Sequence, residues 1–364
     1  MWPFEAKQDL AAVKAGRELA LAEMIKTGTT TFLEMYHLFM NELAEDIERV
    51  GVRATLMRSM IGLCPREEQD EKLAEATNFA KSWHQRANGR IQTMMAPHAP
   101  YTCPPDFIER IVAVASELDI PVHMHLAETR AEVQEHVKKF GRHPLVHLEE
   151  LDVLEDIPWL LAHAVHINQA EIELLSRYSI AVSHNPNSNL KLGSGIAPIQ
   201  QMVEAGVLVA LGTDSVAANN SLDLFEEMRT AVFLQKGIAE NPAILPAGTA
   251  LQMATLKGAE ALQFHNVGKI EKGWQADFIM IEPRAPHLQP RQHIQSHLVY
   301  AAKGSDVTDV YVQGRPLLEN GELLTLDEEK KYWLKRTTNM GGLIKSCTEP
   351  VQDTVRCERE NYLV

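Results

Sequence analysis

The sequence predicts an α/β fold: a (β/α)8 TIM-type barrel that lacks its first strand, followed by a small C-terminal β domain. From residue 8 to residue 214, helical patterns alternate with short segments of apolar and β-branched residues. This alternation is typical of βαβ units and a parallel sheet. After Phe264 it gives way to short strands broken by glycines. Seven barrel strands are visible where a closed barrel needs eight, so we expect the first strand to lie upstream of Met1.

Local spacing predicts each element in turn. Residues 8–27 place Leu10, Val13 and Met24 near helical spacing, and Gly28 can end that helix. Residues 29–36 are β-branched and aromatic, which indicates a strand. The same reasoning predicts further helices at 41–50, 71–87, 106–118, 130–140, 169–177 and 199–205. Further strands are predicted at 53–60, 91–97, 120–128, 159–165, 179–184 and 207–214.

The remaining residues define the expected domains. Residues 221–264 form a long helical zone, and residues 268–282 and 307–323 contain the short strands. We therefore expect a barrel over residues 1–264, a small β domain over residues 265–325 and a charged tail over residues 326–364.

Composition and charge narrow the function classes. The chain has 364 residues, 45% of them hydrophobic, which is ample for a large core. Its net charge of −14 disfavours nucleic acid and anionic membranes as partners. The four cysteines form no CxxC pair, the start resembles no signal peptide, and no apolar run reaches the ~20 residues that cross a bilayer. We expect a cytoplasmic protein, and a homo-oligomer is compatible with the sequence.

Polar residues follow five successive predicted strands, at the point where each strand ends. They are His98, then His125 with Glu128, then His163 with His166, then residues 183–186, and finally residues 211–215 with Asp214. Any one of them has a structural explanation, such as a core histidine or a helix-capping carboxylate. In a barrel, however, the carboxyl ends of the strands meet at one mouth. Convergent histidines and aspartates suit a catalytic divalent metal with an open position for water.

The segment 120–128 carries the clearest part of this pattern. Side chains alternate along a strand, so His123 and His125 face the same side, and His125 lies nearer the tip. We interpret His123 as a structural residue one layer deeper. Glu128 follows on the loop, where a carboxylate that is not a metal ligand can transfer protons.

The motifs at these tips resemble the amidohydrolase superfamily. The segments that carry the resemblance are residues 125–128, 163–166, 183–193 and 211–214, and it extends from Trp2 to about Leu323. The most similar branch is the 5-methylthioadenosine/S-adenosylhomocysteine deaminases, near the chlorohydrolases and other aminohydrolases. The signature of the cytidine-deaminase type, H-x-E with P-C-x-x-C, is absent.

The resemblance implies a role for each matching residue. His125 and Asp214 would bind Zn2+ or another divalent metal such as Fe2+, and Asp214 would also take a proton from the attacking water. Glu128 would protonate the purine ring, and His163 would orient the hydroxide. Glu5 and His98 would hold the ribose hydroxyls of a small-molecule nucleoside. Arg58, and less clearly Lys72, would bind the rest of the substrate.

One part of the family pattern is missing from the sequence. The resemblance implies a His-x-His metal pair on the first barrel strand, but no histidine precedes Thr29. We expect this pair, with the first strand, to lie upstream of Met1, and we expect residues 1–364 alone to bind metal poorly. Two function classes stay open: a metal-dependent deaminase of adenosine-type nucleosides, and a metal-free amidohydrolase-like binding protein. Another aminohydrolase or chlorohydrolase activity is a further alternative.

Overall fold

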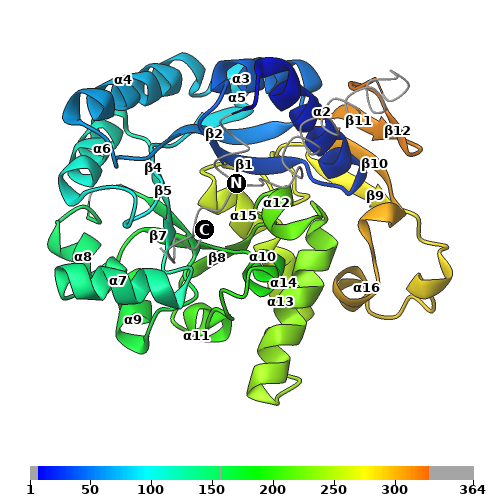
Figure 1. The fold of residues 1–364 in the computed structure, drawn as a ribbon. Coiled ribbons are helices and arrows are strands. Elements are labelled where there is room, and N and C mark those ends of the chain that lie inside the picture. The colour runs from blue at the N-terminus through cyan, green and yellow to red at the C-terminus, as the bar shows by residue number, and fades with distance from the viewer. Residues whose placement is uncertain (1–6, 156, 328–364) are drawn as a thin grey trace, which may run out of the picture.

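Parallel strands form the centre of the molecule, inside a ring of helices (Figure 1). The computed structural model describes residues 7–155 and 157–327. The central strands pair in two groups, β1-β2-β3 with β4 beside β2, and β5-β6-β7-β8. A parallel bridge between Met95 and Val122 joins the groups. The strands are β1 (Thr31–Tyr36), β2 (Arg53–Met60), β3 (Ile91–Thr93), β4 (Ala96–Pro97), β5 (Val122–Leu126), β6 (Trp159–His163), β7 (Ile180–His184) and β8 (Leu208–Leu211).

The helices follow the strands in alternation and cover them from outside (Figure 1). From α2 to α9 they are α2 (Leu10–Lys26), α3 (Met40–Val50), α4 (Arg66–Trp83), α5 (Arg86–Gly89), α6 (Pro105–Leu118), α7 (Arg130–Phe140), α8 (Pro144–Glu150) and α9 (Gln169–Arg177). The later helices are α10 (Pro186–Lys191), α11 (Ile199–Glu204), α12 (Val216–Asn219), α13 (Leu224–Ala239), α14 (Ala247–Met253), α15 (Leu256–Ala261) and α16 (Ile294–Tyr300). Short 3-10 helices lie at η1 (Pro286–Leu288) and η2 (Gly304–Asp306).

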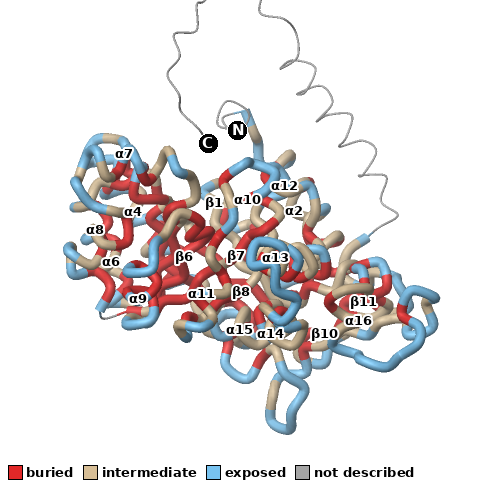
Figure 2. Tube along the Cα trace, turned by 90° about the horizontal axis from the view of Figure 1, so that it is seen from below, coloured by how far each residue is buried: buried red, intermediate tan, exposed pale blue. Residues whose placement is uncertain are grey.

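The core has two layers because side chains alternate along each strand. On β2, Leu56 faces the helices and belongs to the large outer cluster, while its neighbour Met57 faces the barrel axis. The inner cluster is small and consists of Met57, Met94, Ala96, Leu160, Ala181, Ala210 and Ala261. Figure 2 shows the central strands as buried and the surrounding loops as exposed. This layering leaves the strand ends free to carry polar side chains.

A second sheet lies beside α2 (Figure 1). Its antiparallel strands are β9 (Phe278–Ile281), β10 (Val307–Val312), β11 (Arg315–Glu319) and β12 (Glu322–Leu323), in the order β12-β11-β10-β9. Just before β9, the carboxylate of Asp277 accepts two hydrogen bonds from the guanidinium of Arg53, at 2.8 and 3.0 Å. Both side chains are almost fully buried. This bidentate ion pair ties the second sheet to barrel strand β2.

Most predicted elements lie where the sequence places them, and two of the differences lie close to the site. The predicted strand 91–97 is two strands, because Met95 leaves β2 and exchanges backbone hydrogen bonds with Pro121 and His123 at 2.9 Å. Helix α10 was missed because its sequence, Pro-Asn-Ser-Asn, is rich in turn residues; proline at the first helical position explains how it starts.

Some expectations extend beyond what the structure describes. Glu5 and residues 328–364 of the predicted tail lie outside the described residues, and the domain boundaries stay predictions. Within residues 7–155 and 157–327, no helix has both the length and the apolar character that spanning a membrane requires.

Candidate active site

His125 lies on the inner side of β5, beside two other imidazoles. Its ring centroid is 4.8 Å from that of His98 and 5.5 Å from that of His163, which it stacks upon at 22°. Its Nδ1 donates to the carbonyl oxygen of His98 at 2.9 Å, which leaves the Nε2 lone pair free. Burial, and then the neighbouring His163, lowers the pKa of His125. The ring is therefore neutral, the form that binds a metal.

His123 lies one layer deeper, as the alternation along β5 predicts. Its Nδ1 donates to the carbonyl oxygen of Leu160 at 2.8 Å, and the side chain is buried. Burial lowers the pKa of His123 to about 3. The ring is held by β6 as a neutral hydrogen-bond donor, which agrees with its interpretation as a structural residue.

His163 ends β6 in an unusual backbone conformation. Its φ is +75°, and that of the next residue, Ala164, is +46°. Non-glycine residues rarely adopt positive φ, and such strain gathers at functional sites. The turn directs the Nε2 of His163 toward Glu128, whose Oε2 is 3.8 Å away. His163 and Glu128, 35 residues apart in the sequence, therefore meet at the site.

The backbone before α7 is held by the carboxylate of Glu132. Its Oε1 accepts from the N–H of Ala127 at 2.9 Å, and its Oε2 accepts from those of Glu128 and Thr129 at 2.8 and 3.3 Å. In turn, the N–H of Glu132 donates to the hydroxyl oxygen of Thr129 at 3.1 Å, which completes a capping box. The sequence signal for this clamp is Thr-x-x-Glu at residues 129–132. The clamp fixes the short loop that carries Glu128.

Asp214 follows β8 with a φ of +59°. Its Oδ2 accepts from the hydroxyl of Ser188 at 2.6 Å, and its Oδ1 accepts from the N–H of Ser215 at 2.6 Å. Its charge raises the pKa of His125 against the larger effect of burial, so the two side chains are near enough to interact electrostatically. Nearby, a Cβ on Gly212 would lie 2.5 Å from Oδ1 of Asn185, so only glycine fits there.

The chemical types of these side chains suit a divalent metal, but there are too few of them among the described residues for a complete site. His125 offers a neutral imidazole nitrogen, and Asp214 offers a carboxylate. A catalytic zinc usually has three protein ligands. Within the part of the chain that the structure describes, no three His, Cys, Asp or Glu side chains are close enough together to hold a metal ion. The described residues therefore supply part of a metal site.

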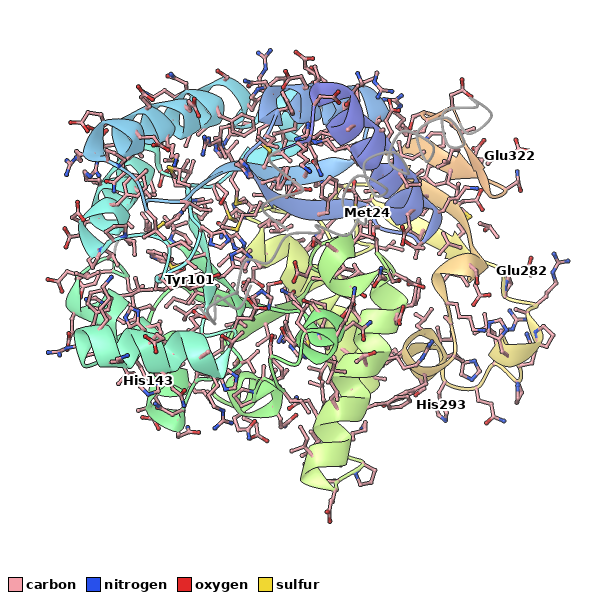
Figure 3. The ribbon with its side chains drawn as sticks, viewed as in Figure 1. Met24, Tyr101, His143, Glu282, His293 and Glu322 are labelled. Atoms are coloured by element: carbon pink, nitrogen blue, oxygen red, sulfur yellow. The ribbon has the colours of Figure 1, made fainter. Side chains whose placement is uncertain are left out.

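The predicted substrate-binding residues divide into two groups. His98 lies beside His125, bonds Thr102 through Nδ1 at 3.0 Å, and has its pKa lowered to about 3 by burial. The ring of Tyr101 meets His98 edge-on at 6.0 Å, inside the ring of helices (Figure 3). Arg58, by contrast, forms an ion pair with Glu75 of α4 at 2.8 Å.

Lys72 also lies among local partners. Its Nζ is 2.8 Å from Oε1 of Glu68 and donates to the carbonyl oxygen of Ile61 at 3.0 Å. The substrate-binding roles of Arg58 and Lys72 therefore stay predictions, and Glu5 lies outside the described residues.

Sequence reasoning missed the residues that hold the site residues in place. Asn189 accepts from Nδ1 of His163, and Ser188 donates to Asp214. Both residues are on α10. The spacing of apolar residues in the sequence does not show that this short helix brings them to the site. His184, at the end of β7, is buried with both ring nitrogens unbonded among the described residues. Burial lowers its pKa to about 3, which keeps the ring neutral.

Comparisons with known proteins find relatives over most of the chain. Residues 5–317 match the model of the amidohydrolase family. The chain is 61% identical over 331 residues to a 5-methylthioadenosine/S-adenosylhomocysteine deaminase of Halalkalibacterium halodurans, covering 91% of this chain and 76% of the relative. It is 45% identical over 330 residues to the protein of the same name from Dictyoglomus thermophilum, with the same coverage.

Solved structures give the same fold. An adenosine deaminase from Xanthomonas campestris with bound zinc superposes with a TM-score of 0.87 at 37% identity, covering 94% of this chain and 78% of that one. An atrazine chlorohydrolase from Arthrobacter aurescens shares the fold, with a TM-score of 0.84 at 22% identity, covering 94% and 79%. The predicted fold class, an α/β protein of the TIM-barrel type, is confirmed.

Proposed function

This chain belongs to the amidohydrolase family, and we propose that it hydrolytically deaminates the adenine ring of 5′-methylthioadenosine, S-adenosylhomocysteine or a related adenosine nucleoside. The observation that carries the proposal is the approach of Glu128 to His163, beside His125, at the tips of neighbouring strands. Relatives at 60–61% identity bear the name of this activity.

The reaction needs proton transfer at two atoms. Water adds to the amino-bearing carbon of the ring, the adjacent ring nitrogen takes a proton, and the tetrahedral product then releases ammonia. Glu128 donates its proton to the ring nitrogen and then carries the proton of the added hydroxyl group to the leaving amino group, and the proton held by Asp214 finally returns to Glu128. Asp214 accepts the proton that the water loses. His163, with its Nε2 bare, orients the oxygen as it attacks.

Other residues hold the substrate. His98 and Glu5 bind the ribose hydroxyls, and Arg58 binds substrate only once it has left its ion pair with Glu75. His125 and Asp214 would hold Zn2+ or another divalent metal such as Fe2+, together with the His-x-His pair that the family resemblance implies for the first barrel strand. Such a metal makes bound water far more acidic. The partners are small nucleosides rather than nucleic acid or membranes, and the protein works in the cytoplasm.

The test is ammonia release by the metal-loaded holoenzyme, reconstituted with Zn2+ or Fe2+. We expect release from 5′-methylthioadenosine, S-adenosylhomocysteine or adenosine, and none from guanine, cytosine or a chlorotriazine. Glu128→Gln should lower turnover by ~10²–10⁴-fold, because glutamine keeps the shape but cannot carry the proton. The matched control is Glu135→Gln on the exposed face of α7. Nucleoside binding without ammonia would favour the metal-free binding protein, and release from chlorotriazines would favour another branch of the family.

A further inference from the structure

We infer that Ser194 is a positioning residue that fixes the carboxylate of Glu128; the inference rests on the proposed function. The hydroxyl of Ser194 donates to Oε1 of Glu128 at 3.3 Å, across 66 residues of sequence. Ser194 is buried, although it lies in the loop after α10. The hydrogen bond is long-range and protected from bulk water, so it is suited to hold a side chain in one orientation.

Two further hydrogen bonds fix the backbone of Ser194 itself. Its N–H donates to the carbonyl oxygen of Asn189 at 2.8 Å. Its carbonyl oxygen accepts from Nε2 of His166 at 2.6 Å. Asn189 also accepts a hydrogen bond from His163, and His166 lies three residues after His163. Both partners of the Ser194 backbone are therefore connected to the end of β6 that carries His163. The hydroxyl therefore cannot move independently of the site.

Close packing holds the loop against β6 as well. Gly195 has a φ of +124°, and a Cβ placed on it would lie 3.1 Å from Cγ1 of Val165 and 3.5 Å from the ring of His166. The loop can come this close to the strand tip only because residue 195 has no side chain. The distance between Ser194 and Glu128 is thus set by backbone contact rather than by flexible side chains.

The two oxygens of Glu128 face different partners. Oε1 accepts from Ser194, while Oε2 faces the bare Nε2 of His163 at 3.8 Å. Without the hydroxyl, the carboxylate can rotate about its last bond and exchange its two oxygens. A proton carrier works only in a narrow geometry, and small misplacements reduce the rate. Because Ser194 engages Oε1, Oε2 is the oxygen that exchanges protons with the substrate.

The experiment compares Ser194→Ala with Ser194→Thr, which keeps a hydroxyl, and with the control Ser176→Ala. Ser176 is exposed on α9 and bonds only the carbonyl oxygen of Glu173 among the described residues. For Ser194→Ala we expect kcat to fall roughly 10–100-fold with KM within about twofold, as for other supporting partners. The threonine variant should recover most of the rate, and Ser176→Ala should match the unchanged protein. Equal losses in kcat and 1/KM would overturn the inference.

A second readout does not depend on turnover. Without the Ser194 hydroxyl, the carboxylate of Glu128 should leave its native position or occupy several positions, which a crystal structure of Ser194→Ala without substrate would show. A crystal structure of Ser194→Thr should keep the single native position. A native position of the carboxylate in Ser194→Ala would overturn the inference even if no nucleoside is deaminated, whereas a displaced carboxylate without ammonia release would count against the proposed function alone.

Discussion

Nδ1 of His163 lies 2.8 Å from Oδ1 of Asn189, and both residues are buried. An amide oxygen only accepts, so this contact places the proton on Nδ1 and leaves Nε2 bare toward Glu128. We predict that Asn189→Ala lowers turnover roughly 10–100-fold by releasing the ring and its tautomer. Nitrogen-15 NMR should show the His163 tautomers becoming mixed, while Asn241→Ala, at an exposed position, should change neither quantity. A single unchanged tautomer in Asn189→Ala would contradict this account.

Glu227 should make stability depend on pH. It is buried on α13, where its oxygens accept from Asn187 and Asn219, and burial raises its pKa to about 7 from 4.5. The folded protein therefore holds a proton that the unfolded chain has lost, and stability falls as pH rises from about 4.5 to 7. At 1.36 kcal/mol per unit, the fall is about 3 kcal/mol.

Glutamine at position 227 cannot ionise, so Glu227→Gln should remove this part of the pH dependence. Urea unfolding at pH 5 and pH 7 measures it, with Glu226→Gln as the exposed neighbouring control. The difference between the two pH values should shrink only in Glu227→Gln. Identical differences in all three proteins would show that Glu227 ionises normally in the fold.

Two glycines should respond to alanine in opposite directions. Gly268 has a φ of +92°, and a Cβ there would lie 2.7 Å from Cα of Leu256. Gly268→Ala should destabilise the protein by at least ~2 kcal/mol through strain and backbone overlap. Gly16 lies within α2 with open space around it, so Gly16→Ala should stabilise by ~1 kcal/mol. Thermal and urea unfolding compare the two, and the same sign for both changes would refute the prediction.

Removing the charge of Asp277 should be costly. Its carboxylate binds Arg53 in bidentate fashion and also accepts from the N–H of Gln313 at 2.8 Å. Asp277→Asn leaves a buried guanidinium without its counter-charge, which typically costs about 3–5 kcal/mol. The exposed pair of Arg284 and Glu282 is the control, and Glu282→Gln should leave the unfolding free energy unchanged. Equal results for both variants would mean that water reaches Arg53.

The elements with strong local signals could be predicted from sequence. Helix α7 begins and ends where expected because a capping box precedes it and Gly141 follows it. The split between β3 and β4 could not be foreseen, because it depends on the hydrogen bonds of Met95 to the segment that leads into β5. The periodicity of a segment shows which of its residues are apolar. It does not show at which residue the backbone hydrogen bonds pass from one neighbouring strand to another.

The candidate site, too, could be predicted only in part from the sequence. His125, Glu128 and His163 could be gathered from sequence because parallel strands end at one mouth. Alternation alone did not show which side of β2 faces inward. Met57 lies on the barrel axis, and Arg58 lies toward α4. The partners that set tautomers and orientations are Asn189, on the short helix α10, and Ser194, in the loop after it; their positions depend on packing rather than on spacing.

The distance in sequence between Arg53 and Asp277 also sets an order of events during synthesis. The two residues are 224 positions apart. At roughly 5–20 residues per second, a ribosome needs roughly 10–45 seconds to reach Asp277 after it has made Arg53. During that interval the guanidinium at the start of β2 must stay hydrated, because burial without its carboxylate is unfavourable. The guanidinium of Arg53 therefore reaches its buried position only after the residues that lead into the second sheet have been made.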